Sequence, residues 1–173
     1  MSYVGEYNNI DGFMNPHELE WLYEQATKMY NVAEIGCWKG KSSHALLSGC
    51  QGKVYCIDHF KGSSTEIGGA HKEAQDRDIS VDFINNVGKF TNLVLLKMDS
   101  AEAAQQVPDV EMVFIDGGHD YVTISADLKA WKHKARKLIC GHDATQDGVP
   151  QALREHFPRG YERVTPGFWL VRL

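Results

Sequence analysis

The chain of 173 residues lacks a long hydrophobic run, a paired-cysteine motif and any excess of positive charge. No apolar run approaches the ~20 residues that span a bilayer, and the N-terminus has no signal-peptide pattern. The four cysteines, Cys37, Cys50, Cys56 and Cys140, are scattered, which disfavours zinc or disulfides and favours buried reduced thiols. We therefore expect a cytoplasmic protein that does not bind a membrane.

The acidic balance of the sequence narrows the range of partners. The chain has 18 Lys and Arg residues against 23 Asp and Glu residues, and this net charge of −5 disfavours nucleic acid as a partner. The length and the 43% share of hydrophobic residues suit one domain over 1–173, with 1–31 as an N-terminal helical cover. Nothing in the sequence sets the oligomeric state, so a homo-oligomer stays open.

Apolar, β-rich segments alternate with stretches that suit helices. The segments are 32–37, 54–58, 93–99, 112–116, 138–141, 161–165 and 168–173. The first five are nearly continuous apolar runs, as in strands buried on both faces of a parallel sheet, and the alternation implies right-handed βαβ units. Only Pro166-Gly167 separates the last two, which predicts an antiparallel hairpin. The expected fold is α/β and Rossmann-like: a doubly wound, mostly parallel seven-stranded sheet ending in an antiparallel hairpin.

Two helices have readable features. Asn15, Pro16 and Glu18 form a helix start, with Asn15 as the N-cap and Glu18 three residues later. A second helix, of about 14 residues, begins near Tyr121 and repeats its apolar side chains at helical spacing. Asp127 lies on that helix, where we expect it to make a structural hydrogen bond or ion pair.

The stretch Val32–Ser43 (VAEIGCWKGKSS) reads as a strand, a tight glycine turn and a new helix. Gly36 allows unusual dihedrals and a close ligand approach, and the helix opened by Ser42 points free N–H groups into the same space. Glu34, just before the turn, argues against a neighbouring phosphate. A nicotinamide enzyme would normally show G-x-G-x-x-G, which is absent.

Acidic residues follow four of the predicted parallel strands: Asp58, Asp99, Asp116 and Asp143. Each could cap the next helix, but the carboxyl ends of parallel strands meet at one ligand-binding edge. Asp58 lies 22 residues after Gly36, the usual distance for a carboxylate that binds ribose hydroxyls. Asp99 and the Ser100 backbone are placed for the adenine amine, and the rings of His59 and Phe60 are placed to flank adenine. The acidic lining suits S-adenosylmethionine.

Four ordered motifs carry a family resemblance: E-I-G-x-x-x-G-K-S-S, V-Y-C-I-D-H-F-K-G, F-I-D-G-G-H-D-Y-x-x-x-x-x-D-L-x-x-W and G-H-D. Over about residues 10 to 157 the chain resembles the class I S-adenosylmethionine-dependent methyltransferases. It is most similar to their small-molecule O-methyltransferase branch, alongside cephalosporin-hydroxylase-like and macrolide-sugar methyltransferases. The resemblance and the rim residues together imply a cofactor site of Glu34, Gly36, Gly40, Ser42, Asp58, His59, Asp99, Ser100 and Asp116.

The resemblance also implies a catalytic and metal-binding group. Asp116 and Asp143 match positions that hold a divalent metal beside the acceptor hydroxyl in several relatives, and His119 matches a candidate general base. Ala144 stands where those relatives have a second acidic or amide residue, so His142 or a water molecule would supply the missing ligand. Oxygen ligands favour Mg²⁺ or Mn²⁺, and a histidine would also tolerate Fe²⁺ or Zn²⁺.

The sequence thus predicts an enzyme that transfers a methyl group from S-adenosylmethionine to a hydroxyl of a small molecule. Two alternatives stay open: an inactive nucleotide-binding or regulatory module on the same fold, and a nicotinamide-dependent oxidoreductase. The glycine- and serine-rich stretch 61–70 is either an active-site loop that orders on binding or an ordinary connection.

Overall fold

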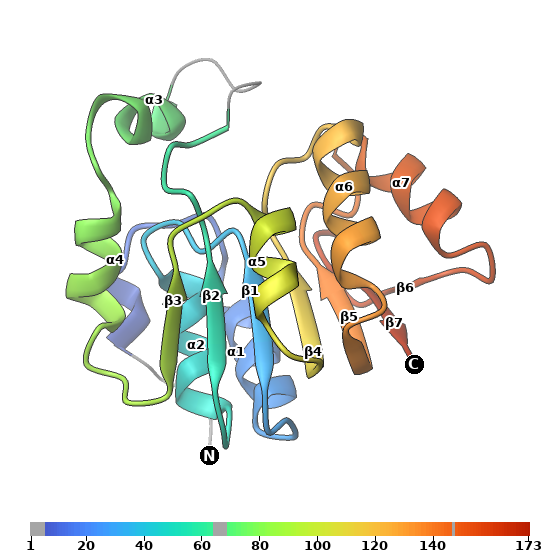
Figure 1. The fold of residues 1–173 in the computed structure, drawn as a ribbon, viewed down its shortest axis with the longest axis horizontal. Helices are drawn as coiled ribbons and strands as arrows, with labels where there is room; N and C mark the ends of the chain where they lie inside the picture. Colours follow the sequence, from blue (N-terminus) through green and yellow to red (C-terminus); the bar gives the residue numbers. More distant parts are fainter. Residues whose placement is uncertain (1–5, 64–68, 147) are drawn as a thin grey trace.

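The computed structural model describes residues 6–63, 69–146 and 148–173. Their strands form one seven-stranded sheet in the order β3-β2-β1-β4-β5-β7-β6 (Figure 1). The strands are β1 (Val32–Ile35), β2 (Val54–Ile57), β3 (Leu93–Leu96), β4 (Val110–Ile115), β5 (Ala135–Gly141), β6 (Glu162–Arg163) and β7 (Trp169–Arg172). β1 to β5 pair in parallel, and β7 runs antiparallel to both β5 and β6. The predicted fold class is therefore confirmed.

Helices cover both faces of this sheet. They are the 3₁₀ helix η1 (Glu6–Asn9), α1 (Pro16–Ala26), α2 (Lys41–Gly49), α3 (Gly69–Asp76), α4 (Ser80–Val87), α5 (Ser100–Gln106), α6 (Tyr121–Trp131) and α7 (Val149–His156). In Figure 1, α5, α6 and α7 lie in front of the sheet, and α1 and α2 lie behind it. None of the helices in the described ranges is long and apolar enough to cross a membrane.

Side-chain alternation along the strands divides the core into two layers. Val32, Met112 and Phe114 belong to the cluster that packs against α1, α2 and α4. Ala33 and Ile35 point to the opposite face, into the cluster formed with α5, α6 and α7. Because successive strand residues face opposite sides, each central strand is buried on both faces, which explains its continuous apolar sequence.

The start of α1 is as predicted. The Asn15 side chain accepts the backbone N–H groups of His17 and Glu18, and the Glu18 carboxylate accepts the Asn15 N–H, completing a capping box. Helix α6 has 11 residues rather than about 14, and Asp120 caps its start. Strand β6 contains only Glu162 and Arg163, both exposed, since an edge strand at the rim has little apolar surface to bury.

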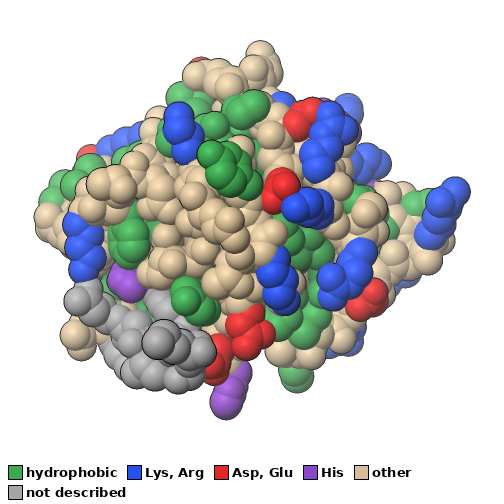
Figure 2. Space-filling model, turned by 90° about the horizontal axis from the view of Figure 1, so that it is seen from below, with side chains coloured by type: hydrophobic (Ala, Val, Ile, Leu, Met, Phe, Trp, Pro, Cys, Tyr) green, Lys and Arg blue, Asp and Glu red, His purple; other side chains and the backbone are tan. Residues whose placement is uncertain are grey.

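The connection from β2 to β3 contains α3 and α4, which were not individually predicted. Residues 64–68 of the predicted 61–70 loop lie outside the described residues, and the loop's proposed role stays a prediction. Figure 2 views the molecule from below Figure 1, where the parallel strands begin. Among the described residues visible there, basic, acidic and apolar side chains are interspersed rather than gathered by kind.

Candidate active site

A cavity of about 1170 Å³ lies at the edge of the sheet where the parallel strands end. Residues 12–14 and parts of α3, α5 and α6 complete its wall. Most of the predicted site residues line it, namely Gly36, Ser42, Asp58, His59, Asp99, Ser100, Asp116, His119, His142 and Asp143. Open α/β sheets bind ligands at this edge, so the topology brings the predicted residues to one place.

The glycine turn after β1 needs glycine for two reasons. Gly36 has φ +86°, and a Cβ built on it would lie 2.2 Å from the backbone oxygen of Asp116. Only a residue without a side chain permits so close an approach between the β1 turn and the end of β4. The Gly36 N–H donates to Ile57 O and the Asp116 N–H donates to Ile35 O, so this turn and the strand ends form one hydrogen-bonded unit.

Asp58 holds the glycine turn from the end of β2. Its Oδ2 accepts the backbone N–H groups of Cys37 and Trp38, both at 2.9 Å, and its Oδ1 accepts the Phe60 N–H at 2.6 Å. Asp58 lines the cavity, as predicted for a ribose ligand, but it already shapes the turn that surrounds that ligand. This second role of Asp58 was not predicted from the sequence.

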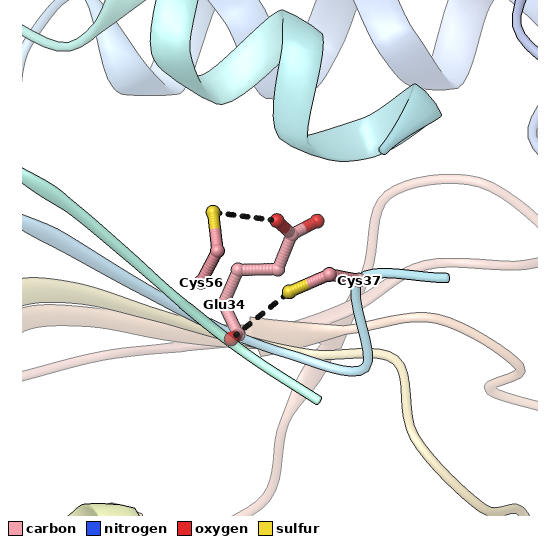
Figure 3. Close-up of side chains that lie close together, drawn as sticks. All are labelled: Glu34, Cys37 and Cys56. Carbon is pink, nitrogen blue, oxygen red and sulfur yellow. Dashed lines mark hydrogen bonds between the residues drawn. The ribbon is translucent and has the colours of Figure 1, made fainter. Parts of the chain in front are cut away.

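Glu34 and Gly40 do not line the cavity, which corrects the expectation that they frame a ligand. Glu34 shares the face of β1 with Val32, so its side chain enters the layer beneath α2 and is 0% exposed. There its carboxylate accepts the Cys56 thiol (Figure 3). The carboxylate also accepts the Ser43 hydroxyl, and burial raises its pKa. A Cβ on Gly40 would instead contact side chains of α4, at the other end of the turn.

The two thiols beside Glu34 also support the turn. Cys37 Sγ donates to the backbone oxygens of Glu34 and Ile57, while Cys56 Sγ donates to the Glu34 carboxylate at 3.5 Å (Figure 3). Burial raises the pKa of both thiols, which keeps them protonated donors. All four cysteines of the chain are free and buried, as the sequence predicted.

The part of the cavity near β2 and β3 differs in detail from the prediction. Asp99 is exposed and makes no side-chain capping bond, whereas Ser100 Oγ accepts the Trp131 Nε1–H at 2.8 Å. Phe60 is 2% exposed and packs on Phe83 in the core, so the expectation that it flanks adenine is wrong. Asp127, predicted to be structural, lines the cavity, and burial raises its pKa to about 6.

Four side chains meet where β4 and β5 end. His119 Nε2 lies 2.7 Å from Asp143 Oδ2, and His142 Nδ1 lies 3.2 Å from the same oxygen. His142 Nδ1 is also 3.6 Å from Asp116 Oδ1, and donor atoms of Asp116, His142 and Asp143 all lie within 4.8 Å of one another. These three are the residues predicted to hold a metal. The geometry brings them together, with two carboxylates and an imidazole nitrogen facing a common point.

The electrostatics of this cluster follow from burial and close opposite charges. Burial raises the pKa of Asp116 to about 7, against the opposing effect of His142. Burial alone would lower the pKa of His142, but the hydrogen bond to Asp143 and the nearby carboxylates raise it to about 9. For Asp143, burial is outweighed by hydrogen bonds to His119 and His142, and its pKa falls well below the usual range.

The backbone around Asp143 is arranged to present its carboxylate. Asp143 has φ +55°, a left-handed conformation that aspartate tolerates better than most residues but that still costs free energy. The Gln146 side chain donates to Asp143 Oδ1 at 2.9 Å, and the Ala144 N–H donates to Gly167 O. Gln146 lines the cavity and was not predicted, although its position three residues after Asp143 is a local signal.

Aromatic side chains form the part of the wall that lies outside the sheet. The rings of Phe13 and His71 are parallel with centroids 6.3 Å apart, and Trp38 lies 5.4 Å from His71. Lys39, which is 7% exposed, pairs with Asp11 at 2.9 Å and with Glu73 at 2.6 Å. These two ion pairs join the N-terminal segment, the glycine turn and α3, and so fix the aromatic wall to the sheet.

Comparison with known protein families identifies the family to which the chain belongs. A family model described as a methyltransferase domain matches residues 33–144, which is more than half of the chain. The chain belongs to this methyltransferase family. The match contains the glycine turn and the strand ends that line the cavity, and it confirms the resemblance to class I S-adenosylmethionine-dependent methyltransferases. A search of curated proteins finds no match to this methyltransferase.

Solved structures share the fold of this methyltransferase at low sequence identity. An O-methyltransferase from Bacillus cereus in complex with SAH is 16% identical, with a TM-score of 0.67 over 96% of this chain and 85% of that one. The SAH-bound methyltransferase PaMTH1 from Podospora anserina is 14% identical, with a TM-score of 0.63 over 92% and 79%. A putative RNA methyltransferase from Pyrococcus horikoshii is 15% identical, with a TM-score of 0.62 over 96% and 93%. These likenesses concern the fold.

Proposed function

We propose that this methyltransferase transfers the methyl group of S-adenosylmethionine to a hydroxyl oxygen of a small molecule, with a divalent cation at Asp116, His142 and Asp143. One observation carries the proposal. A single cavity contains both the glycine turn of a methyltransferase and a cluster of carboxylates and imidazoles at the next strand ends. Its volume of about 1170 Å³ gives room for a donor and an acceptor side by side.

The donor would lie on the side of the glycine turn. Two structures with this fold are described as bound to SAH, the product that S-adenosylmethionine leaves after methyl transfer. Asp99 and Asp127 face the cavity beside Ser100, and their carboxylates are suited to accept hydrogen bonds from hydroxyl or amino groups of the donor. The cationic Lys41 lines the same side and suits the donor's carboxylate.

The donor set fits a divalent metal. Two carboxylates and one imidazole nitrogen converge, and Asp143 is held in a strained backbone conformation that aims it at the same point. This set suits Mn²⁺, Fe²⁺ or Zn²⁺ as well as Mg²⁺, and it supplies through His142 the ligand that Ala144 does not. When bound, such an ion lowers the pKa of an acceptor hydroxyl and fixes its orientation.

The protein's own residues would align the reactants and take up the proton. In the in-line displacement, the bond from the donor sulfur to the methyl carbon breaks as the acceptor oxygen bonds to that carbon. Asp116 would orient the hydroxyl, and His119 would accept its proton at Nδ1 while Asp143 holds Nε2. The carboxylate of Asp143 would stabilise the imidazolium that results, as in other His–Asp pairs.

Calorimetric titrations with S-adenosylmethionine and with NAD, each with and without Mg²⁺ or Mn²⁺, test the donor. We expect S-adenosylmethionine to bind and NAD not to bind, and the reverse result would overturn the proposal in favour of an oxidoreductase. SAH formation with a panel of catechols, sugars and short RNAs then tests the acceptor. Donor binding without turnover on any hydroxylated compound would instead support an inactive binding module.

Variants separate the assigned roles. His119→Asn should retain donor binding and lose turnover, because it removes the proton acceptor from the acceptor side of the cavity. Chelation of divalent ions should abolish turnover and leave donor binding intact. If chelation leaves turnover unchanged, the metal assignment fails while the methyltransferase assignment stands.

A further inference from the structure

Helix α1 contributes a residue to the strand-end cluster that local sequence does not reveal. Glu18 Oε1 lies 3.3 Å from His142 Nε2, across 124 residues of sequence. The Glu18 side chain is 9% exposed and that of His142 is 14% exposed, so the contact is shielded from water. The opposite nitrogen, Nδ1, faces Asp143 at 3.2 Å and Asp116 at 3.6 Å. The imidazole of His142 therefore lies between a carboxylate behind it and two carboxylates in front.

We propose that Glu18 is a positioning residue that holds the Nε2–H of His142 and thereby directs Nδ1 toward Asp116 and Asp143. The inference rests on the proposed metal role of this cluster. A cation at Nδ1 takes the place of the proton on that nitrogen, and the neutral imidazole that results keeps its one proton on Nε2. A histidine that binds a metal through one nitrogen commonly donates the N–H of its other nitrogen to a carboxylate, which fixes both the tautomer and the ring orientation.

Two further contacts keep the His142 ring in this orientation. The ring packs edge-on against Phe168 with centroids 5.2 Å apart, and the His142 backbone oxygen accepts the Trp169 Nε1–H. Gly167 leaves the space that the carboxylate needs. A Cβ there would lie 2.8 Å from Glu18 Oε1 and 3.0 Å from His142 Nε2.

The capping box allows a specific test of Glu18. Its Oε2 accepts the Asn15 N–H, and glutamine can form the same box in place of glutamate. In Glu18→Gln, the side-chain oxygen can serve Asn15 while the NH₂ group faces His142 Nε2. Nε2 must then accept a hydrogen bond from the amide, which places the imidazole proton on Nδ1. A protonated Nδ1 cannot bind a cation. If the amide flips instead, it loses the cap bond and the carboxylate charge beside Nε2.

The first experiment needs no metal. In ¹⁵N-histidine-labelled, metal-free protein, we expect an exchange-protected, downfield Nε2 proton of His142, assigned by its absence in His142→Asn. This resonance should be lost or strongly shifted in Glu18→Gln and retained in Glu24→Gln, the same charge change at an exposed position of α1. An unchanged resonance in Glu18→Gln would overturn the inference.

The second experiment measures Mn²⁺ affinity by electron paramagnetic resonance. Glu18→Gln should weaken binding about 10- to 100-fold, the usual effect of removing such a partner. Gly167→Ala should weaken it in the same direction, because its Cβ separates the two groups without changing either. Asn15→Ala should lower the melting temperature and leave the affinity unchanged, which separates helix capping from positioning.

The two experiments fail independently. If the Mn²⁺ affinity of Glu18→Gln is within about twofold of that of the wild type, the positioning role is overturned, because removing a carboxylate that is hydrogen-bonded to a ligating histidine ordinarily has a larger effect. If the wild-type protein binds no divalent ion, the metal part of the proposed function fails. The His142 resonance then still decides whether Glu18 orients the ring.

Discussion

Replacing Asp58 with alanine tests the claim that this carboxylate holds the glycine turn independently of any ligand. The change removes an acceptor from three backbone N–H groups, at 2.9, 2.9 and 2.6 Å. A hydrogen bond to a charged acceptor contributes about 1.5–3 kcal/mol, so three bonds set an upper range of about 4.5–9 kcal/mol. The site lies on the cavity wall and the side chain is 14% exposed, so water can replace part of this.

We therefore expect Asp58→Ala to lower the free energy of unfolding by about 3 kcal/mol without any ligand. For a chain of this length, that corresponds to a fall in melting temperature of about 6–12 °C. Urea denaturation followed by circular dichroism gives the free energy, and calorimetry gives the melting temperature. A loss of donor binding in this variant is then expected even without a direct ribose contact, because the turn itself is altered.

Asp99→Ala is the matched control for Asp58→Ala. Asp99 carries the same charge on the same rim, but it is exposed and makes no capping bond. Its removal should change stability by less than about 0.5 kcal/mol and weaken donor binding alone. Equal stability of Asp58→Ala and Asp99→Ala would show that the Asp58 carboxylate does not hold the glycine turn.

Three further results are expected. Gly36→Ala should lower the free energy of urea unfolding by at least about 3 kcal/mol, since its Cβ would overlap Asp116 O. Gly160 has φ +98° but open space around it, so Gly160→Ala should lose only about 1 kcal/mol, and equal losses in the two variants would show that the close approach to Asp116 is not what requires glycine at position 36. Burial raises the pKa of Asp127 to about 6 in the folded chain, above its unfolded value of about 3.9, so protonation of Asp127 favours folding. In urea titrations, the free energy of unfolding relative to that of Asp127→Asn should therefore fall by about 2–3 kcal/mol as the pH rises from about 4 to 6. The four buried cysteines should react with Ellman's reagent only after unfolding, and a fast-reacting thiol in native buffer would argue against their burial.

The architecture of the sheet was accessible from sequence because burial on both faces leaves a direct record. Residues 112–115 of β4 have no solvent face, so they appear as an uninterrupted apolar run that ends at Asp116. The predicted connection of Pro166-Gly167 was too short for anything but a hairpin, and a hairpin is observed, although residues 164–168 separate β6 from β7. Boundaries were less accessible, as α6 shows, because helix ends depend on caps and neighbours as well as on apolar spacing.

Side-chain direction was accessible in principle but was misjudged for Glu34. Counting by twos from Val32 places Glu34 on the α2 face of β1, away from the cavity, and this parity is present in the sequence. A glutamate two residues before a glycine turn looks like a ligand contact, yet its carboxylate accepts the hydroxyl of Ser43. For Asp127, by contrast, its position on a helix does not by itself reveal that its side chain faces the cavity at the strand ends.

The contact between helix α1 and the strand-end cluster carried no sequence signal. Glu18 has a complete local explanation as part of a capping box, so nothing in its neighbourhood indicates a second partner 124 residues away. The group of Asp116, His142 and Asp143 could be predicted because each residue ends a strand of the same parallel edge. The position of α1 relative to that edge depends on tertiary packing.

The cavity has two parts of different origin, which the ion pairs of Lys39 with Asp11 and Glu73 help to join. The floor consists of strand ends whose positions the sheet dictates, while the rings of Phe13 and His71 come from residues 12–14 and α3. These two segments are attached through the Lys39 ion pairs and through the hydrogen bond from Lys41 Nζ to Gly12 O. The wall can therefore be exchanged without rebuilding the floor. A library that varies Phe13 and His71 while retaining the Lys39 pairs would change the shape of this wall and leave the strand ends in place, which makes the chain a practical starting point for engineering new methylation specificities.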